Sequence, residues 1–262
     1  MRKAKGDYAI QTVTNALRVL EEFRGEPEIG VAELARRLGL HKNNVFRLLA
    51  THEEIGYIEQ NPATGRYRLG IAALQLGQAF ARSRPLLVRG PAYVDDLSAR
   101  TTESAHLAML DRFEVVHVAG SAPSRLIGGA LRVGRRLPVH CTALGKVLLG
   151  CAPEGEREAF DKKVVAERGL EPRTRHTIRD PDKFFEHVRT VAGQGFALDL
   201  EECEEGLTCA AAPVHDVTGR VVAAISVSVP ASRADEQSLI EQFLPQVVSA
   251  AERLSRELGH HA

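Results

Sequence analysis

The apolar positions of residues 31–50 recur three and four residues apart on both sides of a glycine. They are Leu34, Ala35 and Leu38 before Gly39, and Leu40, Val45, Leu48 and Leu49 after it. This spacing predicts an amphipathic helix on each side of the break. Gly39 can adopt the left-handed backbone in which helices very often end. The pattern therefore predicts two short helices joined by a tight turn, which is typical of a helix-turn-helix.

Polar residues fill the first turns of the second helix, opposite its apolar face. They are His41, Lys42, Asn43, Asn44 and Arg47. Asparagine side chains pair with adenine edges, and lysine or arginine reaches guanine edges or phosphates. We interpret this face as the part that contacts double-stranded DNA. Two alternatives remain open here, an ordinary solvated helix face and a surface that binds another protein.

A further helix is predicted before this motif, over residues 12–23. Thr12 or Thr14 is the expected N-cap, because threonine hydroxyls accept hydrogen bonds from free N–H groups of a first turn. The apolar face expected to pack under the helix-turn-helix consists of Val13, Ala16, Leu17, Leu20 and Phe23.

Two short extended segments follow the motif, at residues 57–60 and 66–69. They surround a turn that contains proline and glycine at 61–65, which predicts a hairpin, the wing of a winged helix-turn-helix. Alternation along the second strand places Arg66 and Arg68 on one face and Tyr67 and Leu69 on the other. The two arginines are candidates for phosphate contacts, which position a protein on DNA without reading its sequence.

Helical patterns over residues 70–81 and 86–100, interrupted by Pro85, predict connecting helices. Beyond them, strands are predicted at 104–110, 113–120, 125–133, 196–202, 207–216 and 221–230, with Asp111-Arg112 as the first turn. Helices are predicted at 143–150, capped by Thr142, and at 154–167, 181–195 and 235–258. We expect helices against one side of a largely antiparallel sheet, so the fold is α/β of the α+β kind. The predicted domains are 1–69, a DNA-binding winged helix, 70–101, linker helices, and 102–262, the mixed domain.

Composition agrees with a reader of nucleic acid joined to a second module. Residues 1–84 hold 13 Lys and Arg against 9 Asp and Glu, whereas the remainder holds 21 against 25. No apolar run follows the basic N-terminus, and no stretch approaches the length of a membrane span, so neither a signal peptide nor membrane contact is expected. The four cysteines form no C-x-x-C pair and are interpreted as reduced thiols of a cytoplasmic protein.

Four segments resemble the IclR family of bacterial transcriptional regulators in the family's order. Besides the helix-turn-helix, they are LPVHCTALGKVLL (137–149), RTRHTIRDPDKF (173–184) and DLEECEEGLTCAAAPVHDVTGRVVAAISVS (199–228). The resemblance implies a winged-helix domain, a GAF-like domain that binds a small effector, and homodimers or homotetramers on a pseudo-palindromic operator. Family members act as repressors, activators or both, and their effectors are often small organic or aromatic acids.

The resemblance also implies an effector site at Ala143, Leu144, Asp199, Leu207, Cys209, Ser226 and Ser228. The residue chemistry agrees, because Ala143 and Leu144 open a helix whose free N–H groups favour a carboxylate. Ser226 and Ser228 lie two apart in an apolar strand and point the same way, although core serines bonded to backbone are an alternative. Leu144 stands where relatives often carry a small residue, which predicts a narrower pocket.

Two other functions are weighed against this regulator. An enzyme would use Cys141 as nucleophile with His140 and Asp199, but no nucleophile-elbow pattern surrounds Cys141. A thiol- or metal-dependent sensor would use His140, Cys141, Cys203 and Cys209, whose spacing matches no zinc pattern. We therefore expect no catalysis, no metal and no cofactor.

Overall fold

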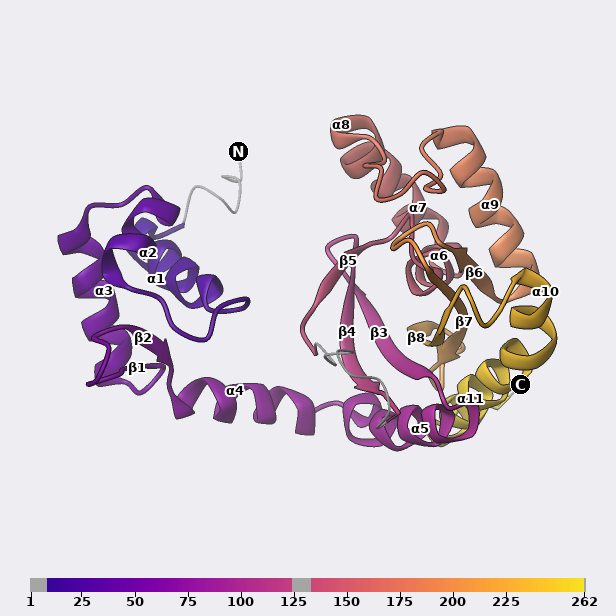
Figure 1. Ribbon diagram of the computed structural model, residues 1–262, viewed down its shortest axis with the longest axis horizontal. Coiled ribbons are helices and arrows are strands. Elements are labelled where there is room, and N and C mark those ends of the chain that lie inside the picture. The colour runs from indigo at the N-terminus through magenta and orange to yellow at the C-terminus, as the bar shows by residue number, and fades with distance from the viewer. Residues whose placement is uncertain (1–8, 124–132, 262) are drawn as a thin grey trace. The chain divides into compact units, whose positions relative to one another are not determined.

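The computed structural model of the protein describes residues 9–123 and 133–261. The chain divides into two compact units, Met1–Ser83 and Arg84–Ala262. The first contains α1 (Gln11–Glu22), α2 (Val31–Leu38), α3 (Lys42–Glu54), β1 (Ile58–Gln60), β2 (Tyr67–Leu69) and α4 (Ile71–Arg82) (Figure 1). No helix in the described ranges is both long enough and apolar enough to cross a membrane.

The helix-turn-helix is confirmed. Gly39 ends α2 with a φ of 67°, and the N–H of Leu40 donates to the carbonyl of Ala35, which closes the turn. The buried core of this unit contains the predicted apolar residues Leu34, Ala35, Leu38, Val45 and Leu49. The first turns of α3 are thereby held with their polar side chains in solvent.

The prediction for α1 was right for Leu20 and Phe23, which pack in the core, but wrong for the cap and for two apolar positions. Ile10 stands at the N-cap and no side chain caps the helix, since the Thr14 hydroxyl donates to the Ile10 carbonyl instead. The buried positions are Val19 and Phe23, whereas Val13 and Leu17 are exposed. The apolar face of α1 that α2 and α3 cover thus begins later along the helix than predicted. Val13 and Leu17, in the first half of α1, remain on the surface.

The wing is an antiparallel hairpin in which Ile58 pairs with Leu69 and Gln60 with Tyr67. Ile29 adds a third extended segment, because its N–H and carbonyl both bond to Tyr67 at 2.9 Å. Tyr67 is buried against the helices, but Leu69 is exposed although it points to the same face.

The described residues of the second unit form one antiparallel sheet of six strands in the order β5-β4-β3-β8-β7-β6. The strands are β3 (Ser104–Asp111), β4 (Glu114–Ser121), β5 (Arg136–Pro138), β6 (Ala197–Leu200), β7 (Leu207–His215) and β8 (Val221–Pro230). The first turn comes one residue later than predicted, because Asp111 still pairs with Glu114 and the left-handed residues are Arg112 and Phe113. The strand predicted at 125–133 lies outside the described residues, apart from Val133.

Helices cover both faces of the sheet, so the expectation of one covered side was wrong. The helices α5 (Pro85–Thr101) and α11 (Leu244–Glu257) pack on one face, and α6 (Ala143–Gly150) with α9 (Pro181–Gln194) packs on the other (Figure 1). Two separate cores result, one on each face. The central strand β8 is buried over most of its length for this reason.

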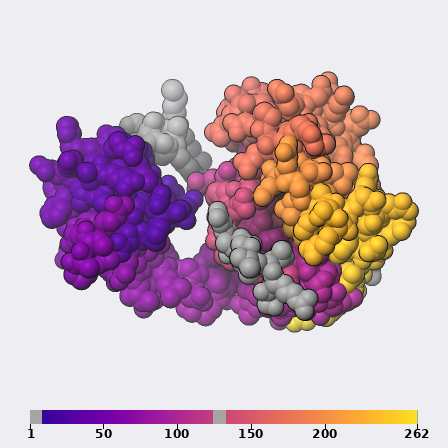
Figure 2. Space-filling model, in the orientation of Figure 1, coloured from indigo at the N-terminus to yellow at the C-terminus, as the bar shows by residue number. Residues whose placement is uncertain are grey.

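The remaining helical segments are α7 (Glu154–Phe160), η2 (Asp161–Val165), α8 (Ala166–Arg168), α10 (Glu236–Ser238) and η3 (Leu239–Phe243). The first three follow one another directly, and α10 and η3 lead directly into α11. The helices predicted at 154–167 and 235–258 are therefore continuous, but each contains one π-helical turn. Figure 2 shows both units as packed bodies. Among the elements of the second unit, α6 and the strands next to it position the candidate site.

Candidate functional site

The polar residues of α3 lie on an exposed surface. His41 stands at the N-cap, and the side chains of Lys42, Asn43, Asn44 and Arg47 follow in solvent on the first turns of the helix. No carboxylate of the described residues forms an ion pair with Lys42 or Arg47. Their charges are therefore available to an anionic partner.

The two wing arginines differ from those of α3 because each already has a carboxylate neighbour. Arg66 donates to the Glu28 carbonyl at 2.9 Å and to the Glu33 carboxylate at 3.2 Å. Arg68 donates to Glu59 at 2.6 Å. A phosphate would have to compete with these surface ion pairs, which are individually weak.

The start of α6 is built by Thr142 and Gly145. The Thr142 hydroxyl accepts the N–H of Gly145 at 3.1 Å, which confirms the predicted cap. A Cβ at Gly145 would collide with the carbonyl oxygen of Val139, so only glycine allows the helix to begin this close to the preceding segment. The N–H groups of Ala143 and Leu144 have no acceptor among the described residues.

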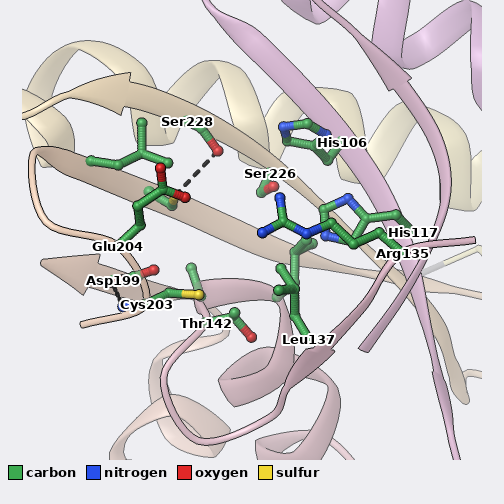
Figure 3. Close-up of a pocket in the computed structure, with 14 residues that line it drawn as sticks. His106, His117, Arg135, Leu137, Thr142, Asp199, Cys203, Glu204, Ser226 and Ser228 are labelled. Atoms are coloured by element: carbon green, nitrogen blue, oxygen red, sulfur yellow. Dashed lines mark hydrogen bonds between the residues drawn. The ribbon is translucent and has the colours of Figure 1, made fainter. Parts of the chain in front are cut away.

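One cavity brings all seven residues predicted for the effector site together (Figure 3). The sheet register explains this, because Asp199 on β6, Cys209 on β7 and Ser228 on β8 are successive cross-strand neighbours. The Cys209 sulfur lies 3.1 Å from the Ser228 hydroxyl. Ser226 makes no side-chain hydrogen bond with a described residue, so its hydroxyl is available inside the cavity.

Seven further residues of the described part of the chain line the cavity and were not predicted for the effector site from sequence. They are His106, His117, Arg135, Leu137, Thr142, Cys203 and Glu204. The same signal that marked the serines could have found two of them, because His106 and His117 also interrupt strands of apolar residues. Arg135 gave no such signal, since it lies outside the strands and only the tertiary fold turns it toward the cavity.

Asp199 is held by its own loop. Its Oδ1 accepts the N–H of Glu202 at 2.7 Å and of Cys203 at 3.3 Å. Burial raises the pKa of Asp199 to about 7, although these hydrogen bonds and the nearby Lys146 oppose the shift. A ligand hydroxyl or carboxylate can therefore meet this side chain in either protonation state near neutral pH.

The pKa of Asp199 predicts a pH-dependent stability. The folded protein holds a proton on this group that the unfolded chain releases, so this contribution to stability falls as the pH rises from about 4 to about 7. Asp199→Asn removes the contribution, and we expect the variant to gain stability relative to the wild type across this window. Urea unfolding at pH 5 and pH 8 measures it, with exposed Asp95→Asn as control. A constant difference between variant and wild type would contradict the prediction.

The alternatives with cysteine chemistry gain no support from the geometry. Cys141 is buried, and a hydrogen bond with Cys203 together with burial raises its pKa, which disfavours a thiolate nucleophile. The Nε2 of His140 bonds to the Glu171 carbonyl at 2.8 Å. Within residues 9–123 and 133–261, no group of three or more His, Cys, Asp or Glu side chains is placed to hold a metal ion.

Comparison with known proteins matches both units to families. Residues 12–62 match the IclR helix-turn-helix domain, and residues 78–256 match the C-terminal region of the bacterial transcriptional regulator IclR. The HTH-type transcriptional regulator XynR of Escherichia coli is 35% identical over 254 residues, which cover 97% of this chain and 99% of that protein.

Solved structures give the same result. The crystal structure of Thermotoga maritima IclR covers 96% of this chain and 100% of its own, with a TM-score of 0.76 and 28% identity. The inducer-binding domain of a PobR double mutant from Acinetobacter, in complex with 3-hydroxybenzoic acid, is 30% identical. It covers 64% of this chain and 95% of its own, with a TM-score of 0.58.

Proposed function

Since this chain belongs to the IclR family of bacterial transcriptional regulators, we propose that α3 reads a pseudo-palindromic operator while the cavity of the second unit binds a small organic acid. The DNA-binding residues of this proposal are His41, Lys42, Asn43, Asn44, Arg47, Arg66 and Arg68. The effector-binding residues are Ala143, Leu144, Asp199, Leu207, Cys209, Ser226 and Ser228. The functional domains are 1–69, 70–101 and 102–262, and the protein acts in the cytoplasm, where it meets DNA.

The observation that carries the effector proposal is the cavity itself. It combines two free N–H groups at the start of α6 with the hydroxyls of Ser226 and Ser228 on a wall that is otherwise largely apolar around Leu144 and Leu207. Converging donors in such a cavity suit a small oxygen-bearing anion. The complex of the PobR domain with 3-hydroxybenzoic acid supports an effector that is a small organic acid.

We propose a homodimer or homotetramer as the functional form. In the first unit, α4 has no buried residue, and Ile71, Leu74 and Leu76 are exposed on it. On α1 the apolar Val13 and Leu17 are exposed as well. Exposed apolar side chains in this density favour a second copy of the chain as their partner, and two-fold symmetry would match a pseudo-palindromic site.

The effector would act by shifting an equilibrium between two arrangements of the DNA-binding units. A ligand can do this only if it binds one arrangement more tightly than the other. The loop around Asp199 is the part of the cavity best suited to respond, because the backbone N–H groups of this loop bond to the same carboxylate that faces the ligand.

Selection of bound duplexes from a random DNA pool at two salt concentrations tests the proposed function. We expect enrichment of a pseudo-palindrome that persists at the higher salt concentration, because base contacts add affinity that salt does not remove. The proposal would be refuted if the protein bound all duplexes alike and lost this binding at the higher salt concentration, both without a ligand and in the presence of each small organic acid of a screen.

A further inference from the structure

One end of the cavity holds an arginine and two histidines. His106 on β3 and His117 on β4 lie with their ring centroids 5.0 Å apart, and Arg135 lines the same end (Figure 3). His106 reaches the cavity because it pairs with Ser226 across β3 and β8. The carboxylates of Asp199 and Glu204 lie at the other end, with the two serines between (Figure 3).

The side chains of His117 and Arg135 lack hydrogen-bond or ion-pair partners within the described part of the chain. The side chain of His117 is only 9% exposed, and its buried Nε2 has no hydrogen-bond partner there. No described carboxylate forms an ion pair with the Arg135 guanidinium. A buried polar atom without a partner costs free energy, and such atoms are uncommon in native proteins.

Among the described residues, Arg135 alone carries the charge of this end. Burial is the main cause that lowers the pKa of His106 and of His117 to about 4; the charge of Arg135 contributes to both shifts, and His117 contributes to that of His106. Both rings are therefore neutral near pH 7, and a neutral imidazole can donate or accept one hydrogen bond through each nitrogen. Together the three side chains provide one fixed positive charge and adaptable hydrogen-bonding groups.

Resting on the proposed function, we propose that His106, His117 and Arg135 form a second binding end for the effector, separate from the start of α6. The effector is then a two-ended acid. One carboxylate binds the free N–H groups of Ala143 and Leu144, and a second oxygen group, a hydroxyl or another carboxylate, binds the histidines and the arginine. An acid with an apolar far end would leave the guanidinium and the buried imidazole nitrogen without a partner.

Matched acids that differ only at the far end test this proposal. The probes are butyrate, 4-hydroxybutyrate and succinate, and then benzoate, 4-hydroxybenzoate and terephthalate, each titrated calorimetrically into the full-length protein. We expect at least one two-ended acid to bind at least about tenfold more tightly than its one-ended counterpart. The reason is that the one-ended acid leaves buried polar groups of the cavity unpaired. The hydroxyl and carboxylate members distinguish the two kinds of second group.

Variants assign the preference to these residues. Arg135→Gln and His117→Phe should each reduce this preference for the two-ended acid to within about threefold. Arg112→Gln, at the exposed hairpin turn, is the matched control and should keep the preference. Circular dichroism and operator binding report whether each variant is folded.

The outcomes that overturn this inference are distinct from failure of the proposed function. A panel in which no two-ended acid exceeds its counterpart, including one in which nothing binds, overturns the second binding end. So does a preference that survives in both variants. Operator binding in the same preparations shows whether the protein is still a sequence-specific regulator.

Discussion

Arg47→Glu is expected to lower the affinity for the selected operator at least about 100-fold. The substitution removes a guanidinium that can contact a base or phosphate, a contact worth about 1–3 kcal/mol, and adds a negative charge facing the DNA. Arg47 is exposed on α3, so its replacement removes no ion pair and no side-chain hydrogen bond with a described residue. Fluorescence anisotropy with the labelled duplex measures the loss.

The control for this variant is a charge reversal elsewhere. Arg168→Glu changes the net charge by the same amount at an exposed position of α8 in the second unit. It should bind the operator nearly as the wild type does. Sedimentation should show the same oligomer for all three proteins. Operator binding by Arg47→Glu within about threefold of the wild type would show that α3 does not read DNA.

Lys146→Met is expected to destabilise the second unit by about 3–5 kcal/mol. Lys146 is fully buried on α6, where its ammonium donates to the Glu202 carboxylate and to the Leu198 carbonyl at 3.0 Å. Without this cation the Glu202 carboxylate, whose pKa burial already raises, is buried without a counter-charge. Urea unfolding monitored by circular dichroism measures the change.

The double variant Lys146→Met with Glu202→Gln separates charge from packing. It removes both charges of this buried pair, so we expect it to recover at least half of the lost stability. Val164→Ala, a partly buried apolar truncation in the same unit, provides a comparison for lost packing alone. A double variant as unstable as Lys146→Met would mean that the cost comes from packing and not from the unpaired carboxylate.

The ion pair also links two parts of the cavity. Lys146 lies three residues after Ala143, and Glu202 lies in the loop whose N–H groups hold Asp199. The start of α6 and the carboxylate opposite it are thus fixed relative to each other by one buried contact. This contact was not predicted, because a lysine in an apolar helix gives no indication of which distant acid faces it.

The sequence by itself determined the local elements with short-range causes. Gly39 and the apolar spacing around it fixed the helix-turn-helix, and Thr142 fixed the start of α6. The residues carried over by family resemblance also converge on one cavity. The two helix features depend on neighbours a few residues apart, for which backbone conformation and side-chain periodicity are sufficient, whereas the convergence on one cavity was predicted only from the resemblance and is produced by the sheet register.

Only the tertiary structure decided which faces are covered and which distant groups meet. Helices on both sides of the sheet, the exposure of Val13 and Leu17, and the turn at Arg112 and Phe113 all depend on packing partners or strand register far along the chain. The cavity end formed by His106, His117 and Arg135 has the same origin. Sheet register and burial bring these side chains together, and neither is encoded in the local spacing of apolar and polar residues.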